Sequence, residues 1–238
     1  MIIEWLNPEG TMLFGDRGNW MLLQRIFPEA TLIETPLHSI PAFTHQHVDL
    51  LCMGSMNERM QTQMIQWLRT YQQDLKSRIQ NDLGCLFFGN SQDILGLRIT
   101  RKNQFVQEAL GLYPFSVTQE AIKRYNALVG IQTKYGLILG HKSTFSLLHD
   151  TQELPSFGKV VQGFGHNIDD PLDGIHDHHM IATSLMGPML VLNPHFTKHY
   201  LKEITQQEII IPYYEDLELA YEAKKKEFEL SSHFVYEK

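Results

Sequence analysis

Short runs of consecutive apolar residues recur through the first part of the chain, each long enough for one strand. Apolar runs of this length, bounded by turn-forming residues, are typical of strands buried on both faces of a sheet. The pattern predicts four such strands, over Ile2–Leu6, Thr31–Glu34, Val48–Met53 and Leu83–Phe88.

Helical spacing appears between these runs, in Asn19–Phe27 and Met60–Ile79. The second segment places its apolar side chains on one face of a single predicted helix: Met60, Met64, Ile65, Leu68, Leu75 and Ile79. Strand followed by helix, repeated, favours a mostly parallel sheet covered on both sides. We therefore expect a three-layer α/β fold.

The second half of the chain has a different pattern. Leu128–Ile131, Gly136–Leu139 and Lys159–Gly163 predict shorter, partly antiparallel strands. A helical tail follows from about Tyr213 to Leu230, with few apolar residues among many charges. A solvated surface helix is the simpler interpretation of this tail, and a partner-docking helix is the alternative. We find no internal repeat or low-complexity linker, which favours one compact domain.

Composition narrows the classes of function. The 238 residues are 43% hydrophobic and 20% charged, with a formal net charge of -7, so nucleic-acid binding is not expected. No apolar stretch approaches the roughly 20 residues of a membrane span, and the N-terminus does not resemble a signal peptide. Only two cysteines, Cys52 and Cys85, occur, and both lie in apolar runs. A reducing, cytoplasmic location is the expectation.

One segment has the form of a nucleophile elbow. The apolar strand ending at Phe88 runs into the small-residue turn Gly89-Asn90-Ser91, and a helix is expected to follow. A sharp turn of this kind exposes one side chain above a sheet and aims a backbone N–H at a developing oxyanion. Alone the signal is weak, because many strand–turn–helix units look similar.

Three further segments contain the glycines and polar residues of a possible site. Phe14–Asn19 forms a turn in which Asn19 is expected to cap the next helix. Gly158–Asn167 is followed by the acidic-glycine pair Asp173-Gly174, and then by Ala182–Leu190.

In order and separation these segments resemble GatD, the glutaminase subunit of lipid II isoglutaminyl synthase and a relative of the cobyric acid synthase amidotransferases. The family patterns are LYGDxGN, CGGYQxLG, GxGNN and GTYLHGPxL. The resemblance implies a class I glutamine amidotransferase-like (flavodoxin-like) domain over residues 1–205. Residues 206–238 would be a helical tail packed on that domain.

The resemblance also implies that the catalytic dyad is lost. Gly89 stands at the position of the family's nucleophilic cysteine, and Met186 at the position of its histidine. Glutamine hydrolysis through a thioester needs a thiolate and a proton acceptor, and neither residue supplies one. We expect Gly89 to relieve backbone strain and Met186 to fill the space of the imidazole. Asp16 is retained from the opening motif, with either a site role or a role in closing its turn.

Four residues are the expected ligand-binding positions by the same resemblance. Gly54 and Ser55 survive from a glycine-rich turn that forms part of the glutamine pocket, and Asn90 follows the nucleophile position. Arg124 lies near the family's pocket arginine, although the match is one residue out of step, and an ordinary surface arginine is the alternative.

Other residues are candidates for relocated chemistry. Cys52, Cys85 and Ser91 are possible nucleophiles, but the cysteines are expected to be buried and inert, and Ser91 has no evident acid–base partner. His176, His178 and His179, with His166 upstream, form a histidine-rich segment. A hydrophilic surface loop is the expected interpretation, and metal or anion binding the alternative. No cofactor is expected.

The expected function is a GatD-like subunit without glutaminase activity. By resemblance its partner would be a Mur-ligase-like amidoligase of the MurT type, acting on a peptidoglycan precursor. Two alternatives remain: an active amidotransferase or hydrolase with relocated catalytic residues, and a protein that uses the pocket to bind glutamine or another small molecule.

Overall fold

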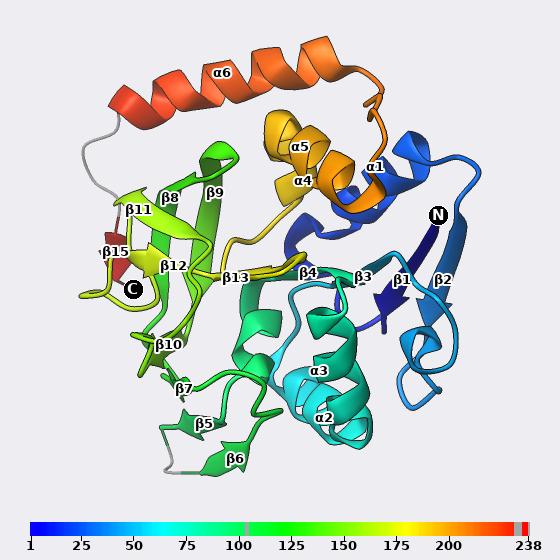
Figure 1. The fold of residues 1–238 in the computed structure, drawn as a ribbon. Helices are drawn as coiled ribbons and strands as arrows, with labels where there is room; N and C mark the ends of the chain where they lie inside the picture. Colours follow the sequence, from blue (N-terminus) through cyan, green and yellow to red (C-terminus); the bar gives the residue numbers. More distant parts are fainter. Residues whose placement is uncertain (103–104, 231–234, 238) are drawn as a thin grey trace.

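A six-stranded central sheet organises the computed structural model, which describes residues 1–102, 105–230 and 235–237. The strand order is β13-β14-β4-β3-β1-β2, and only the edge strand β13 is antiparallel to its neighbour (Figure 1). The strands are β1 (Ile2–Leu6), β2 (Thr31–Thr35), β3 (Leu50–Met53), β4 (Gly84–Phe88), β13 (Ile175–Asp177) and β14 (Met180–Thr183). The first four agree with the predicted strands to within two residues at each end.

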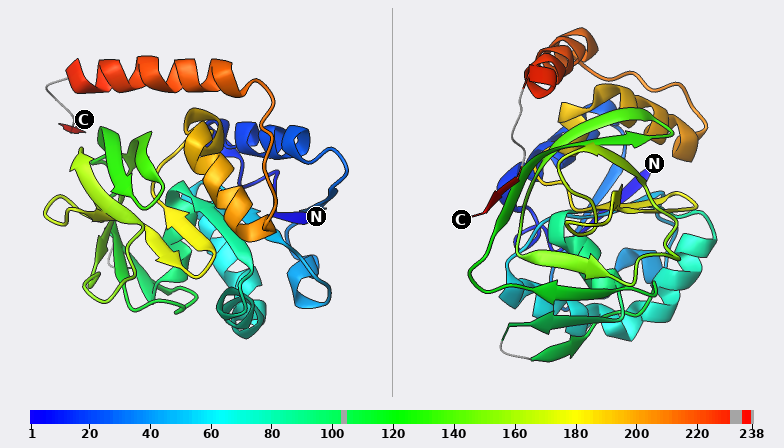
Figure 2. Two further views of the ribbon diagram at one scale, coloured as in Figure 1. Left: turned by 45° about the horizontal axis from the view of Figure 1, so that its top comes forward. Right: turned by 90° about the vertical axis from the view of Figure 1, so that its left-hand side faces the viewer.

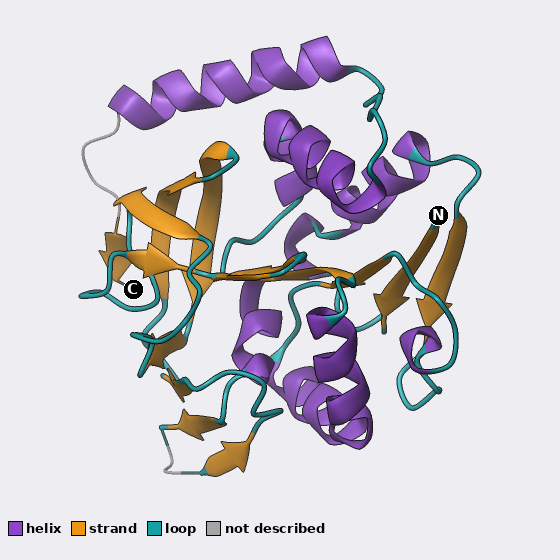
Figure 3. Cartoon of the chain, viewed as in Figure 1, coloured by secondary structure: helices purple, strands orange, loops and turns teal. Residues whose placement is uncertain are grey.

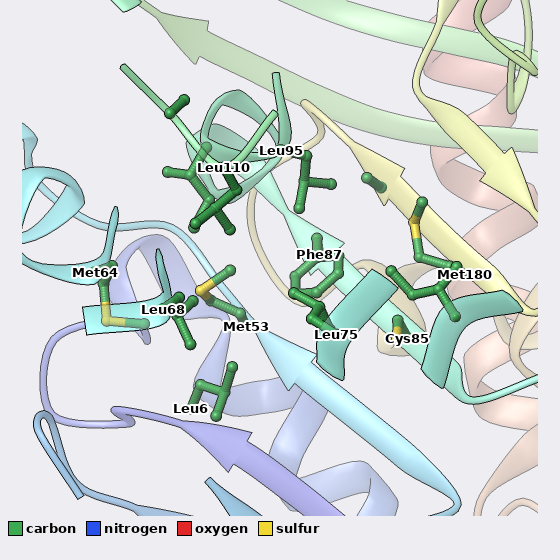
Figure 4. Packing of buried hydrophobic residues seen from close by; sticks show 14 of the residues in the cluster. Leu6, Met53, Met64, Leu68, Leu75, Cys85, Phe87, Leu95, Leu110 and Met180 are labelled. Atoms are coloured by element: carbon green, nitrogen blue, oxygen red, sulfur yellow. The ribbon is translucent and has the colours of Figure 1, made fainter. Parts of the chain in front are cut away.

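Successive side chains of each strand point to opposite faces of the sheet, so the strands contribute to two separate hydrophobic cores. In β3, Leu50 and Cys52 face one side of the sheet, and Leu51 and Met53 face the other. All four side chains are fully buried, as expected for a parallel strand between two layers. Figure 4 shows the second of these cores, where Met53 and neighbouring strand residues meet side chains from the helices.

Helices cover both faces of this sheet (Figures 1 and 3). On one face lie α1 (Arg17–Ile26), α4 (Met189–Leu192) and α5 (Pro194–Thr205). On the other lie α2 (Glu58–Leu68) and α3 (Gln72–Gln80), joined by the 3-10 turn η3 (Arg69–Tyr71). The remaining 3-10 helices are η1 (Leu13–Gly15), η2 (Ala42–Thr44) and η4 (Gly89–Leu95). The expected three-layer α/β fold is thus confirmed.

The prediction of one continuous helix over Met60–Ile79 was wrong, because the chain breaks at Arg69. The Arg69 guanidinium donates hydrogen bonds to the carbonyl oxygens of Glu108 (2.5 Å) and Ala109 (3.3 Å), far along the chain. This tertiary contact is invisible to helical periodicity. The predicted apolar face nevertheless packs into one core on both sides of the break.

A second error concerns Asn19, which lies inside α1 rather than at its N-cap. Its side-chain oxygen accepts a hydrogen bond from the Leu190 N–H (2.8 Å), and its amide nitrogen donates to the Gly187 carbonyl (3.4 Å). Asn19 therefore ties the opening turn to the segment after Met186. The sequence pattern could not indicate this role, because Asn19 is 171 and 168 residues away from its two partners.

Two smaller sheets lie beside the central one, mostly antiparallel as predicted for the second half (Figure 2). One contains β5 (Arg98–Arg101), β6 (Val106–Glu108), β7 (Ser116–Gln119) and β10 (Ser146–His149). The other contains β8 (Tyr125–Thr133), β9 (Gly136–Thr144), β11 (Gly158–Gln162), β12 (Leu172–Asp173) and β15 (Val235–Glu237).

The tail forms α6 (Tyr214–Leu230), which runs along the outside of the molecule (Figure 1). Tyr221 and Phe228 are buried against Leu139, and the Tyr221 hydroxyl donates to the Leu137 carbonyl (2.7 Å). Leu219, by contrast, is 70% exposed. Among the described helices, none combines the length and apolar character needed to cross a bilayer.

Candidate functional site

Gly89 occupies the turn where β4 ends, at the carboxyl edge of the central sheet. Its φ of +60° lies in the left-handed region, which glycine adopts without a Cβ penalty. The Gly89 N–H donates to the Leu185 carbonyl (3.0 Å), which joins the turn to the segment after β14. The turn has the expected elbow geometry, although the element after it is the 3-10 helix η4.

Met186 lies directly beside Gly89. A Cβ built on residue 89 would be 3.6 Å from Met186 Cγ, so the two positions meet although they are far apart in sequence. Met186 is 7% exposed, and its sulfur accepts a hydrogen bond from the Ser143 N–H (3.3 Å). The structure therefore brings together the two positions that the family resemblance assigns to the dyad, and fills the second with an apolar thioether.

Ser55 occupies the space into which a side chain at residue 89 would extend. The same Cβ would lie in contact with Ser55 Oγ and 3.1 Å from Ser55 Cβ. Ser55 is only 2% exposed, and its hydroxyl would have to turn away to admit the new Cβ. A side chain at residue 89 thus needs both a strained backbone and a displaced serine.

Asp16 holds the turn that carries Ser55. Its carboxylate accepts a hydrogen bond from the Ser55 N–H (2.6 Å), and a Cβ on Gly54 would come within 2.9 Å of Asp16 Cγ. Burial raises the pKa of Asp16 to about 7, and the Ser55 N–H offsets only part of this effect. Asp16 therefore packs beneath the turn, and the missing side chain of Gly54 lets it approach.

A cavity of about 170 Å³ opens beside Gly89 and Met186. Three of the four expected ligand-binding residues line it: Ser55, Asn90 and Arg124. Gly54 lies in the turn that carries Ser55 and is outside the lining. The Asn90 side chain is already hydrogen-bonded within the protein: it accepts from the Met56 N–H (2.9 Å) and donates to the Met56 carbonyl (2.7 Å).

Arg124 is half-buried at this cavity, with its guanidinium carbon 4.5 Å from the centre of the Phe145 ring. Stacking on an aromatic face orients the guanidinium and leaves its N–H donors directed along the plane. Arg124 thus lines the cavity with its guanidinium held over the Phe145 ring.

Among the lining residues that the sequence analysis did not single out are Gln92 and Asp93, both within η4. Asp93 accepts hydrogen bonds from Ser146 Oγ (2.6 Å), Gln61 Nε2 (3.1 Å) and Gln119 Nε2 (3.5 Å). Burial raises its pKa to about 6 despite these donors. The only sequence signal was their place just after the elbow.

Gln92 differs from its neighbour in having no partners. It is 1% exposed, and neither its amide nitrogen nor its amide oxygen has a hydrogen-bond partner among the residues that the structure describes. Buried polar groups in folded proteins are nearly always paired, so this unpaired amide is unusual.

The three candidate nucleophiles lie outside the cavity lining. Cys52 and Cys85 are fully buried in β3 and β4, and burial raises the pKa of both thiols. The Ser91 hydroxyl points into the fold, where it donates to the carbonyls of Phe88 (2.7 Å) and Met53 (3.1 Å). Both cysteines are thus buried as expected, and the Ser91 hydroxyl is engaged by backbone carbonyls.

A buried ion pair braces the wall next to the cavity. Lys142 Nζ lies 2.8 Å from Asp173 Oδ1 and also donates to the carbonyls of Phe164 (2.9 Å) and Gly165 (2.8 Å). Asp173 accepts further hydrogen bonds from Thr183 and Ser184. The acidic-glycine pair seen in the sequence thus anchors the glycine-rich segment to the end of β14.

The histidine-rich segment is spread over separate environments. His176 stacks on Tyr135, with ring centres 5.7 Å apart. His178 contacts Asp177 (2.8 Å), and His179 contacts the Asp82 carbonyl (3.2 Å). Across residues 1–102, 105–230 and 235–237, no group of three or more histidine, cysteine or acidic side chains could hold a metal ion.

Comparison with known proteins supports the resemblance. A scan against models of known protein families finds no match. The chain is 22% identical over 198 residues to the lipid II isoglutaminyl synthase (glutamine-hydrolyzing) subunit GatD of Staphylococcus aureus (strain N315), covering 82% of this chain and 81% of the relative. It is 25% identical over 218 residues to the GatD subunit of Streptococcus pneumoniae (strain ATCC BAA-255 / R6), covering 86% and 82%.

Solved structures show the same fold. A glutamine amidotransferase superposes with a TM-score of 0.55 at 15% identity, covering 86% of this chain and 99% of that one. PurLQS from Thermotoga maritima superposes with a TM-score of 0.57 at 9% identity, covering 86% and 95%. The chain is therefore GatD-like in sequence and has a glutamine amidotransferase-like fold.

Proposed function

We propose that this chain is a GatD-like subunit of a cell-wall amidation system and lacks glutaminase activity of its own. The observation that carries the proposal is the contact between Gly89 and Met186 at the elbow, where the family resemblance places nucleophile and base. Neither side chain can form a thioester or accept a proton near neutral pH.

Several described residues that could rebuild a dyad are already engaged elsewhere. His166 lines the cavity, but its Nδ1 contacts Asp170 (2.9 Å) and its Nε2 contacts the Gly174 carbonyl (3.1 Å). Asp93 is held by three donors, and both cysteines are buried away from the cavity. This arrangement argues against an active enzyme with relocated residues.

The partner follows from the relatives, which are named as subunits of lipid II isoglutaminyl synthase. We propose a Mur-ligase-like amidoligase of the MurT type as the second subunit, acting on the peptidoglycan precursor. Such a ligase would draw on free ammonia, which needs no thioester step, while this chain scaffolds or regulates it.

The arrangement of the chain is part of the same proposal. Residues 1–205 would form the amidotransferase-like domain, with residues 206–238 as a tail packed on it. The burial of Tyr221 and Phe228 supports this for the described part of the tail, whereas residues 231–234 and 238 lie outside the described residues. The free thiols Cys52 and Cys85 favour a reducing, cytoplasmic location.

Glutamate release from glutamine by the wild-type chain, alone and co-expressed with a Mur-ligase-like subunit, tests the proposal. We expect no release above a no-protein blank and co-purification of the two subunits. Turnover that survives purification and requires this chain would refute the inactive assignment.

A variant that restores the family's cysteine and histidine makes the test more specific. We expect an electrophilic glutamine analogue to add its mass to the triple variant Gly89→Cys, Met186→His, Ser55→Gly, and to leave the wild type unmodified. The Ser55 change removes the hydroxyl that would collide with the new Cβ. The double variant that keeps Ser55 is the matched control and should label more slowly.

A further inference from the structure

Helix α6 packs on the molecule with one face and exposes the other. Tyr221 and Phe228 are buried on its inner face, whereas Leu219 and Leu230 are 70% and 86% exposed. The helix lies on the outside of the molecule in every view (Figures 1 and 2). Single exposed leucines are common on protein surfaces, so the pattern of the whole outer face decides what they mean.

Five exposed residues form one stripe along this outer face, which we call the outer stripe. They are spaced three or four residues apart, as residues on one side of a helix are: Asp216, Leu219, Ala223, Lys226 and Leu230. The outer stripe thus has the spacing by which two helices pair along their length.

The outer stripe is complementary to its own reverse. From Asp216 to Lys226 it reads acid, large apolar, small apolar, base, and a second α6 running the other way presents base, small, large, acid. In that register Asp216 of each copy faces Lys226 of the other, and Leu219 of each copy faces Ala223 of the other. A large side chain against a small one lets the helices interdigitate. Every contact occurs twice, as a twofold axis requires.

The two charges of the outer stripe are unpaired within the described part of the chain. Neither Asp216 nor Lys226 takes part in an ion pair with another described residue. They lie ten residues and so about 15 Å apart along the helix, too far to pair with each other. An antiparallel second helix gives each an opposite charge and also aligns the two helix dipoles favourably. A parallel pair would instead place like charges side by side.

We propose that two copies of this chain associate through their outer stripes, with the two α6 helices antiparallel. None of the residues that line the cavity beside Gly89 belongs to α6, so the association leaves that cavity open. The inference is independent of the proposed function, because it uses no residue of the candidate site.

Sedimentation equilibrium of the purified full chain tests the proposal. We expect a species of twice the 27.6 kDa chain mass to grow with concentration. One helix pair is a small interface, so the dimer should dissociate at micromolar concentrations. Asp216→Lys and Lys226→Asp should each raise the dimer Kd by about tenfold or more, because both ion pairs become contacts between like charges.

An equimolar mixture of these two single variants is the decisive sample. In the mixed pair every acidic residue again faces a basic one, so the mixture should dimerise about as well as the wild type. Asp74→Lys is the matched control, because Asp74 is also an exposed aspartate in the first turn of a helix, but in α3 on the other side of the central sheet. This control should leave the dimer Kd unchanged.

A wild-type chain that stays monomeric at about 100 μM would overturn the inference. Single variants that dimerise like the wild type, or a mixture that stays monomeric, would overturn it equally. If Asp216→Lys instead prevents co-purification with the Mur-ligase-like subunit, the outer stripe is the surface that the ligase covers, and the inference of self-association fails. None of these results bears on glutamate release, so the proposed function is tested separately.

Discussion

Replacing Asp16 by asparagine should abolish a pH dependence of stability that burial builds into this fold. Asp16 is 0% exposed, and its carboxylate accepts the Ser55 N–H at 2.6 Å. Asparagine has nearly the same shape and keeps an oxygen for that hydrogen bond, but it has no proton to lose. The substitution thus isolates the cost of ionising Asp16.

The sign and size of the effect follow from linkage. Burial raises the Asp16 pKa from 3.8 to about 7, so in this interval the folded chain keeps a proton that the unfolded chain has lost. Stability contributed by this group is full below pH 3.8 and is lost as the pH rises through about 7. At about 1.4 kcal/mol per pH unit, the loss between about pH 5 and about pH 8 is roughly 3 kcal/mol.

Urea unfolding at about pH 5 and about pH 8 measures this loss of stability. The free energy of unfolding of wild type minus that of Asp16→Asn should fall by roughly 3 kcal/mol from about pH 5 to about pH 8. Asp169→Asn, at an exposed carboxyl, is the control and should change stability by less than about 0.5 kcal/mol at either pH. A difference between wild type and Asp16→Asn that stays constant, or grows with pH, would show that the buried carboxyl is not protonated in the folded state.

Three further outcomes are expected. Gly89→Ala should lower the free energy of unfolding, measured in urea, by about 1–3 kcal/mol, because φ at residue 89 is +60° and the new Cβ meets Ser55. Adding Ser55→Gly should recover part of this loss. If it recovers none, the strain does not come from the contact with Ser55. Lys142→Met should cost about 3–5 kcal/mol by leaving Asp173 buried without its cation, and a neutral result would contradict the ion pair. A thiol reagent should titrate neither Cys52 nor Cys85 in the native chain and both after denaturation; a rapidly reacting native thiol would argue for a relocated nucleophile.

The sequence alone was sufficient for β1 to β4 of the central sheet but did not indicate β13 and β14, because only long apolar runs leave a clear signal in consecutive residues. β3 and β4 are continuous apolar runs, and their alternate residues fill separate cores. The elbow was also readable, since the change from apolar strand to small-residue turn at Gly89 is local.

Part of the candidate site was predictable by resemblance. The motifs assigned the dyad positions to Gly89 and Met186, and the structure brings these positions into contact. They also indicated Ser55, Asn90 and Arg124, which line the cavity. The motifs describe residue types, however, and carry no information on which side chains the fold uses for itself.

Only the tertiary structure shows which side chains the fold uses for itself, because hydrogen bonds and steric contacts between distant segments have no periodic signature in the sequence. It showed that Asn19 binds the segment after Met186, and that Arg69 contacts a distant strand where the helix breaks. It also placed Ser55 against the empty side of Gly89, and left the Gln92 amide without a partner. Sequence indicated β1 to β4 and, by resemblance, which residues stand at the dyad positions. Packing determined what fills the space around them.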